Sequence, residues 1–178
     1  TAAHSTLYLN NTSSCTFQKN KMINKIYGNS LLKKLKVLDK NYIENKDFFS
    51  LTASHNGYEK KFGYIHTRKV KILKNKDQIF GEDQLKKTQK HSNSVTYSVR
   101  FHIYPDIKVV KTKSGNSVLI KLLNGEGWLL QSDTNVFEIE KNIFLGNKNK
   151  IINNESVSIF GTTSEPSTSI KWKIERIN

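Results

Sequence analysis

Residues 107–132 read IKVVKTKSGNSVLIKLLNGEGWLLQS, and this stretch decides the fold class of the chain. Three short runs within it, 107–112, 117–122 and 128–132, are rich in Val, Leu and Ile, which is typical of strands. The runs are separated by 113–116 and 124–127, which contain Gly and Asn residues that tolerate a positive φ angle. The stretch therefore predicts three strands joined by hairpin turns.

The same pattern continues in both directions from this stretch, and helical periodicity is scarce. The candidate strands are residues 5–9, 33–38, 49–54, 67–73, 79–85, 95–103, 107–112, 117–122, 128–132, 136–143, 155–160 and 169–175. Twelve strands with short turns predict an all-β fold, an antiparallel two-sheet β-sandwich. Residues 18–30 have the weakest pattern and are predicted to be a long loop.

The length of 178 residues fits one sandwich domain over residues 1–178. The sequence opens at Thr1 without an initiator Met and enters a predicted strand almost at once, so we expect the C-terminal fragment of a longer chain. Six large aromatic residues lie in or beside predicted strands and are expected to fill the core between the sheets. They are Phe101, Trp128, Phe137, Phe144, Phe160 and Trp172.

The chain has 29 Lys and Arg residues against 15 acidic residues, which gives a formal net charge of +14. Such a charge attracts polyanions, so nucleic acid, an anionic membrane surface and acidic polysaccharide all qualify as partners. The basic residues are scattered, and a compositional bias toward Lys and Asn explains them equally well. No apolar run approaches the roughly 18 residues that a membrane-spanning helix needs.

Few residues form a chemical motif by spacing alone. Cys15 is the single cysteine, so it can form neither an internal disulfide nor a multi-cysteine zinc cluster. Ser54 and His55 are neighbours on a predicted strand and point to opposite faces, which argues against a hydrolase pair. The five histidines include no His-x-His pair, so a metal site would need distant segments. They are His4, His55, His66, His91 and His102.

Several segments, taken in order, resemble the C-terminal part of heparinase II/III-like polysaccharide lyases. They are TAAHSTL (1–7), ASHNGY (53–58), FGYIHTR (62–68), GEDQL (81–85), RFHIYP (100–105), GEGW (125–128), IFLG (143–146) and IKWKIER (170–176). The resemblance covers nearly the whole chain. One departure is Asn56, which stands where the family often has an acidic residue.

This resemblance implies a periplasmic or secreted enzyme in which a helical toroid precedes β-sandwich layers, with the active-site cleft between them. It also implies cleavage of acidic, uronic-acid-containing polysaccharide by β-elimination, which needs a general base and a cationic environment for the developing enolate. Much of the acid–base apparatus would come from the toroid, so the fragment is expected to be inactive alone. The resemblance also implies that the full-length protein binds zinc.

The resemblance suggests site residues in this chain. His4 lies in the Ala-His-Ser-Thr segment and is predicted to be a metal-site or cleft residue, with the other ligands upstream of Thr1. Five further residues fall in matching motifs and are candidates for binding carboxylate or sulfate. They are His55, His66, Arg68, Arg100 and His102. The structural alternative is that Arg68 and Arg100 pair with Glu82 or Asp83 and connect neighbouring strands.

Two other functions remain open on the sequence. A non-catalytic carbohydrate-binding sandwich would have the same fold and basic surface, and would bind anionic glycan in a salt-sensitive way. A nucleic-acid binder is third, because aromatic residues and lysines are interleaved but no recognised nucleic-acid-binding motif is present.

Overall fold

The structure is a computed structural model that describes residues 4–28, 31–33, 35–88, 93–133, 137–147, 150–163 and 166–177. Fourteen strands and two short helices are present in these residues. The fold is therefore an antiparallel β-sandwich, as the sequence predicts. His91 lies outside the described residues.

The strands form three antiparallel sheets. The eight-stranded sheet has the order β4-β5-β6-β7-β14-β11-β10-β9, and the four-stranded sheet has the order β1-β8-β13-β12. β2 (Thr16–Phe17) and β3 (Leu31–Lys33) form a small third sheet. The larger sheet contains β4 (Val37–Glu44), β5 (Phe48–His55), β6 (Tyr64–Leu73), β7 (Gln78–Lys87), β9 (Lys108–Lys111), β10 (Ser117–Lys121), β11 (Gly127–Ser132) and β14 (Ser167–Ile177). The four-stranded sheet contains β1 (Leu7–Leu9), β8 (Thr96–His102), β12 (Phe137–Asn147) and β13 (Lys150–Thr162).

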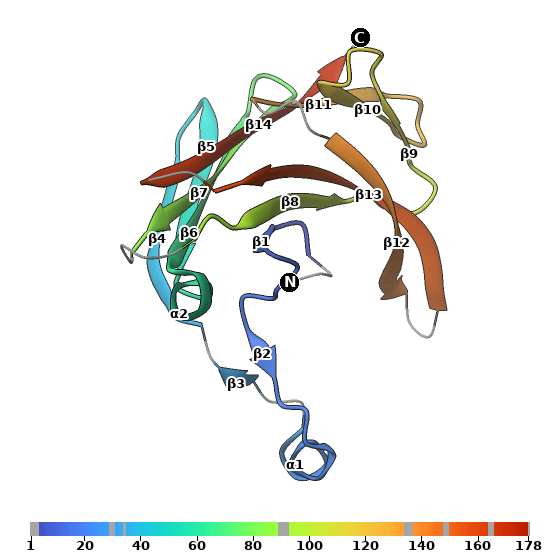
Figure 1. Cartoon of the computed structure of the whole chain (residues 1–178). Coiled ribbons are helices and arrows are strands. Elements are labelled where there is room, and N and C mark those ends of the chain that lie inside the picture. Colours follow the sequence, from blue (N-terminus) through green and yellow to red (C-terminus); the bar gives the residue numbers. More distant parts are fainter. Residues whose placement is uncertain are drawn as a thin grey trace.

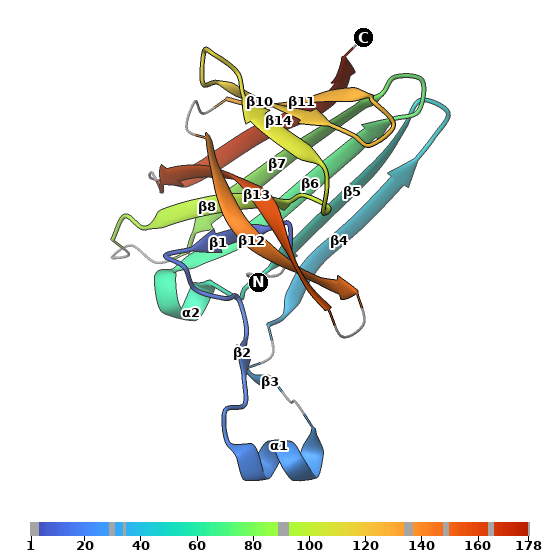
Figure 2. The same cartoon turned by 90° about the vertical axis from the view of Figure 1, so that its right-hand side faces the viewer.

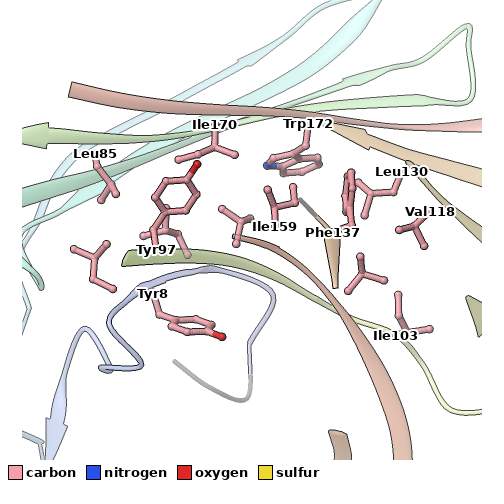
Figure 3. Close-up of a cluster of buried hydrophobic side chains, with 14 of the residues drawn as sticks. Tyr8, Leu85, Tyr97, Ile103, Val118, Leu130, Phe137, Ile159, Ile170 and Trp172 are labelled. Carbon is pink, nitrogen blue, oxygen red and sulfur yellow. The ribbon is translucent and has the colours of Figure 1, made fainter. Parts of the chain in front are cut away.

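The eight-stranded sheet curves over the four-stranded sheet, and their facing sides enclose the core (Figure 1). Buried side chains such as Leu85, Ile170 and Trp172 of the larger sheet lie opposite Ile159 and Phe137 of the smaller one (Figure 3). We call this side of the eight-stranded sheet its inner face and the other side its outer face. Successive side chains of a strand alternate between the two faces.

The hairpins predicted from residues 107–132 are confirmed. β9, β10 and β11 are consecutive antiparallel neighbours. The connecting turns place Gly115 at φ 75° and Gly125 at φ 90°, a region that favours glycine. The sequence thus encodes this corner of the sheet locally, through turn chemistry.

The predicted aromatic core is confirmed in part. Phe137 and Trp172 are buried, and Phe101 and Trp128 pack against the same cluster. Phe101 and Trp172 meet edge to face across the two sheets, with ring centroids 5.0 Å apart. Phe144 is half-buried and instead contacts Tyr104, at 5.2 Å between centroids. Phe160 is half-buried opposite Ser98, on the side of the four-stranded sheet that faces away from the core.

The prediction of a long loop over residues 18–30 is wrong, because it contains helix α1 (Lys21–Tyr27). Asn20 caps the N-terminus of the helix, because its side chain accepts hydrogen bonds from the backbone N–H groups of Met22 and Ile23. Seven residues are too few for a clear helical period. The second helix, α2 (Glu59–Phe62), is a single turn between β5 and β6.

The single strand predicted over residues 33–38 is also wrong. The chain leaves β3 at Lys33 and enters β4 at Val37, which continues to Glu44. All eight residues of β4 are exposed at the edge of the sheet, so no apolar alternation marks the strand. β2, α1 and β3 together extend away from the sandwich as an arm (Figures 1 and 2).

Within the described residues, no helix has the length and apolar character required to cross a membrane.

Candidate functional site

A buried carboxylate organises the candidate site on the inner face of the eight-stranded sheet. Asp83 of β7 has no exposed surface and lies opposite Arg68 of β6 and Ile170 of β14. Arg68 donates to it in a bidentate manner, from Nε to Oδ1 at 2.8 Å and from Nη2 to Oδ2 at 2.9 Å. Trp172 donates from Nε1 to Oδ2 at 3.0 Å, and His66 Nε2 lies 2.7 Å from Oδ1. Four hydrogen bonds from three side chains therefore fix Asp83.

Two histidines continue this network toward the edge of the sheet. His55 of β5 and His66 of β6 are directly opposite each other, and His66 Nδ1 lies 3.1 Å from His55 Nε2. The Gly57 N–H donates to His55 Nδ1 at 3.1 Å. Because that bond makes His55 Nδ1 an acceptor, we assign the proton of His55 to Nε2, which donates to His66 Nδ1. His66 then donates from Nε2 to Asp83, and every bond in the series has one donor and one acceptor.

We call Asp83, His66, His55, Arg68 and Trp172 the Asp83 cluster. Burial raises the pKa of Asp83, but the hydrogen bond from His66 and the charge and hydrogen bonds of Arg68 outweigh burial and hold this pKa at about 2. Burial, aided by His66, lowers the pKa of His55 to about 4. At neutral pH the cluster therefore contains a carboxylate and an uncharged His55.

The turn after His55 is tightly packed. A Cβ atom at Gly57 would lie 2.6 Å from the carbonyl oxygen of Ser14 and 3.1 Å from His55 Nδ1. Only glycine allows the segment around Ser14 to approach His55 so closely. Asn56 accepts from the backbone N–H of Lys36 at 2.8 Å and so holds the entry to β4.

The N-terminal segment connects the Asp83 cluster to the four-stranded sheet. The Arg68 guanidinium also donates from Nη1 to the carbonyl oxygen of Ser5. Ser5 Oγ accepts from the backbone N–H of His102 at 2.9 Å. His4 precedes Ser5 directly and is exposed. Three of the predicted site residues beyond His4, namely His55, His66 and Arg68, thus lie in one connected region beside it. His102 joins this region through its backbone N–H.

Arg100 belongs to a different network, on the side of the four-stranded sheet that faces away from the core. Its Nη2 donates to Tyr8 Oη at 2.6 Å and to Glu140 Oε2 at 2.9 Å. Its guanidinium also lies 4.8 Å from the centroid of the Tyr8 ring. Ser158 donates to the same Glu140 oxygen at 2.9 Å. Arg100 therefore connects β1, β8 and β12.

The alternative that Arg68 and Arg100 pair with Glu82 or Asp83 is confirmed for Arg68 and wrong for Arg100. Arg68 pairs with Asp83 as that alternative predicts. Arg100 pairs with Glu140 instead of Glu82 or Asp83, because β8 and β7 belong to different sheets. Both guanidinium groups are thus engaged within the fold.

Asp83 and Trp172 are the main site residues that the sequence analysis did not identify as such. The signal for Asp83 was its position in the alternation Ile79, Gly81, Asp83, Leu85, where a carboxylate occupies a place that strand periodicity assigns to the core. The signal for the His55–His66 pair was the antiparallel register across β5 and β6, which His-x-His spacing does not detect.

The residues that the structure describes do not by themselves form a zinc site. Within the ranges that the structure describes, no group of three or more His, Cys, Asp or Glu side chains is placed to hold a metal ion. Structural and catalytic zinc sites take at least three protein ligands. His55 and His66 bring two nitrogens together, but these already hydrogen-bond each other. Zinc binding at His4 stays a prediction that requires further ligands.

Fold and cluster together define an antiparallel β-sandwich whose larger sheet buries an Asp–His–Arg network beneath its N-terminal segment. The family described as "Heparinase II/III-like, C-terminal" matches residues 1–173. The chain belongs to this family.

Solved structures agree on the fold. Heparan sulfate lyase HepC from Pedobacter heparinus matches with a TM-score of 0.73 at 15% identity, over 99% of this chain and 24% of that protein. A structure of heparinase III matches with a TM-score of 0.67 at 15% identity, over 98% of this chain and 24% of that protein. The chain thus spans about a quarter of these proteins.

A curated relative is similar in sequence over part of the chain. FtsZ-localized protein C from Caulobacter vibrioides is 30% identical over 96 residues, which are 50% of this chain and 16% of the relative. That protein is named for its localisation with FtsZ.

Proposed function

We propose that the chain is the C-terminal β-sandwich of a longer protein, here called the parent, that cleaves uronic-acid-containing polysaccharide by β-elimination. The observation that carries the proposal is the Asp83 cluster, in which His55, His66 and Arg68 meet beneath the N-terminal segment that contains His4. Family membership and the heparan sulfate lyase named among the structural relatives support the reaction class. Because the substrate would be an extracellular polymer, the proposal includes a periplasmic or secreted location.

Within this proposal the Asp83 cluster positions the cleft and is not itself the acid–base pair. Arg68 is held by Asp83 and by the Ser5 carbonyl, and both nitrogens of His55 are engaged in hydrogen bonds. Asp83, with a pKa of about 2, is too weak a base to remove a C5 proton at neutral pH. Of the groups beside the Asp83 cluster that the structure describes, the exposed His4 is the one that we expect to reach substrate or zinc, and the base and acid would come from the rest of the parent.

The test measures unsaturated uronate, by its ultraviolet absorbance, after incubation of the parent with a panel of acidic glycans. Wild-type parent should release product, the 178-residue chain alone should not, and His4→Ala should lower kcat by about a hundredfold or more, as loss of a reacting-centre contact does. Lys113→Ala, an exposed change in the β9–β10 turn, is the control and should retain full activity. Absence of product from every glycan would reject the lyase.

Zinc is tested separately, by metal analysis of the purified parent. The proposal expects bound zinc in the wild type and reduced content in His4→Ala, whatever the activity. Equal zinc content in both proteins would remove His4 from the metal site.

A non-catalytic carbohydrate-binding sandwich is the second candidate. It is favoured by the complete internal pairing of Asp83, since a cluster that satisfies its own hydrogen bonds can be purely structural. The Caulobacter relative, named for localisation and not for an activity, is in line with such a role. Salt-sensitive binding of heparan sulfate by a parent that forms no product would support this candidate over the lyase.

A further inference from the structure

The outer face of the eight-stranded sheet carries an exposed aromatic ring between two lysines. Phe80 of β7 lies directly opposite Lys71 of β6 and Lys173 of β14, and 38% of its surface is exposed. Asp83 lies three positions after Phe80 on β7, and its side chain points to the inner face. Strand alternation therefore places Phe80 on the side of the sheet opposite the Asp83 cluster.

A second row of charged residues lies next to this ring. Glu82 of β7 is opposite Lys69 of β6 and Lys171 of β14. It accepts hydrogen bonds from Ser169 Oγ at 2.7 Å and from Lys69 Nζ at 3.3 Å. The hydrogen bond from Ser169 and the Lys69 and Lys171 charges lower the pKa of Glu82. Glu82 is therefore a fixed, ionised acceptor between two lysines.

These residues surround a hollow of about 320 Å³, here called the Phe80 hollow. Its lining includes Ser50, Lys69, Lys71, Phe80, Glu82 and Lys171. A smaller hollow of about 180 Å³ adjoins it and shares Phe80 and Lys171. The pair forms a depression across several strands, with three lysines and one carboxylate in the larger part.

We propose that the Phe80 hollow is a second, non-catalytic binding site for a segment of sulfated or carboxylated polysaccharide. The apolar face of a sugar ring would stack on Phe80, while Lys71 and Lys171 bind sulfate or carboxylate and Glu82 accepts from hydroxyl groups. The excess of lysine over acid in the lining selects an anionic ligand over a neutral one. The ligand class rests on the proposed function, but the site lies on the opposite face of the sheet from the Asp83 cluster.

A site of this kind changes how the parent would meet a polymer. A long chain held at the outer face has its remaining length at high effective concentration near the cleft. Short substrates cannot contact both places, so they gain nothing from the Phe80 hollow. Loss of the Phe80 hollow should therefore weaken the binding of long chains and leave the cleavage of short ones unchanged.

The test measures binding of a heparin octasaccharide to the 178-residue chain by isothermal titration calorimetry. Lys71→Gln/Lys171→Gln should weaken binding about tenfold, because two charge-assisted contacts are lost. Phe80→Ala should weaken it about threefold through lost stacking, without changing the salt dependence. The control Lys111→Gln/Lys113→Gln removes the same charge from exposed positions at the β9 end of the sheet and should change affinity less than about twofold.

Equal losses in the two double variants would overturn the proposal, because binding would then follow total charge. Tighter binding of an oligothymidylate that competes for the same residues would overturn the ligand class in favour of nucleic acid. Circular dichroism confirms that each variant is folded. Failure of the parent to cleave any glycan would reject the lyase and leave this binding result standing, so the two failures are distinguishable.

Discussion

Asp83 and Glu82 are adjacent acidic residues on one strand, and they occupy opposite environments. Asp83 is completely buried on the inner face and accepts hydrogen bonds from three side chains. Glu82 lies on the outer face with a quarter of its side chain exposed. The same strand therefore places a fully buried carboxylate on one face of the sheet and a partly exposed one on the other. A buried charge is strongly coupled to the stability of the fold, whereas an exposed one remains available to a ligand.

The largest expected effect comes from breaking the buried side. Asp83→Ala leaves Arg68, His66 and the Trp172 indole N–H without their acceptor, and such a loss costs about 3–5 kcal/mol of unfolding free energy. Glu82→Ala is the matched control one residue away and should cost less than about 1 kcal/mol. Urea denaturation of both variants measures the difference. Similar losses would mean that Asp83 is not the organising charge of the site.

A smaller effect is expected from removing one donor from Asp83. Trp172→Phe loses the hydrogen bond from Nε1 to Oδ2 but leaves the donors Arg68 and His66, so we expect a loss of about 1.5–3 kcal/mol.

Trp128→Phe provides the control, because the buried Trp128 Nε1 has no hydrogen-bond partner among the described residues. That substitution removes a similar volume but no hydrogen bond, and it should destabilise less. Equal losses in the two denaturation curves would assign the Trp172 effect to packing alone.

These two tryptophans also show what the sequence could predict. Strand alternation and turn residues predicted the sandwich, most of its strands and the burial of Trp172, because these depend on local patterns. The role of Trp172 as a donor to Asp83 depends on the register of β7 with β14, which pairs segments about 90 residues apart and has no local signal. The exposed strand β4 and the arm helix α1 were missed because neither has a periodic buried face.

The candidate site was predictable to a similar extent. Family resemblance drew attention to His55, His66 and Arg68, and pairing of β5, β6 and β7 brings these three residues together. The resemblance placed Arg100 in the same set of candidates, and the structure shows its guanidinium bound to Tyr8 and Glu140 within the region of the four-stranded sheet. Motif order along a chain does not specify which sheet a strand joins, so it could not separate Arg100 from Arg68.

The pH dependence of stability is the next test of the buried side. His55 has a folded-state pKa of about 4 against 6.5 in the unfolded chain, so the unfolded state binds the proton more readily between these values. Its contribution is complete above pH 6.5 and is lost as the pH falls toward 4. Because His55 is partly exposed, we expect about 1–2 kcal/mol after allowance for solvent screening.

Asp83 adds a separate step at lower pH. Its pKa of about 2 lies below the ordinary value of 3.8, so its stabilisation is lost as the pH falls from about 4 to 2. Urea denaturation across the pH range should show the upper step in the wild type and a flatter curve in His55→Gln. Glu82→Gln should keep the upper step unchanged, and a His55→Gln curve that matches the wild type would assign that step to another group.

The smallest effect is expected on the outer face. There Lys69 Nζ lies 3.3 Å from Glu82 Oε2, and both side chains are partly exposed. Lys69→Gln should lower the unfolding free energy by less than about 0.5 kcal/mol, since water and salt screen an exposed pair. Arg68→Gln, the neighbouring change on the inner face, should cost about 3 kcal/mol because it leaves the Asp83 charge buried without its main partner. Raising the salt concentration should abolish the small Lys69 effect and leave the Arg68 effect nearly intact, because ions do not reach Asp83. A Lys69 effect that is large and insensitive to salt would mean that the pair between Lys69 and Glu82 is structural, and Glu82 would then not be available to a ligand at the Phe80 hollow.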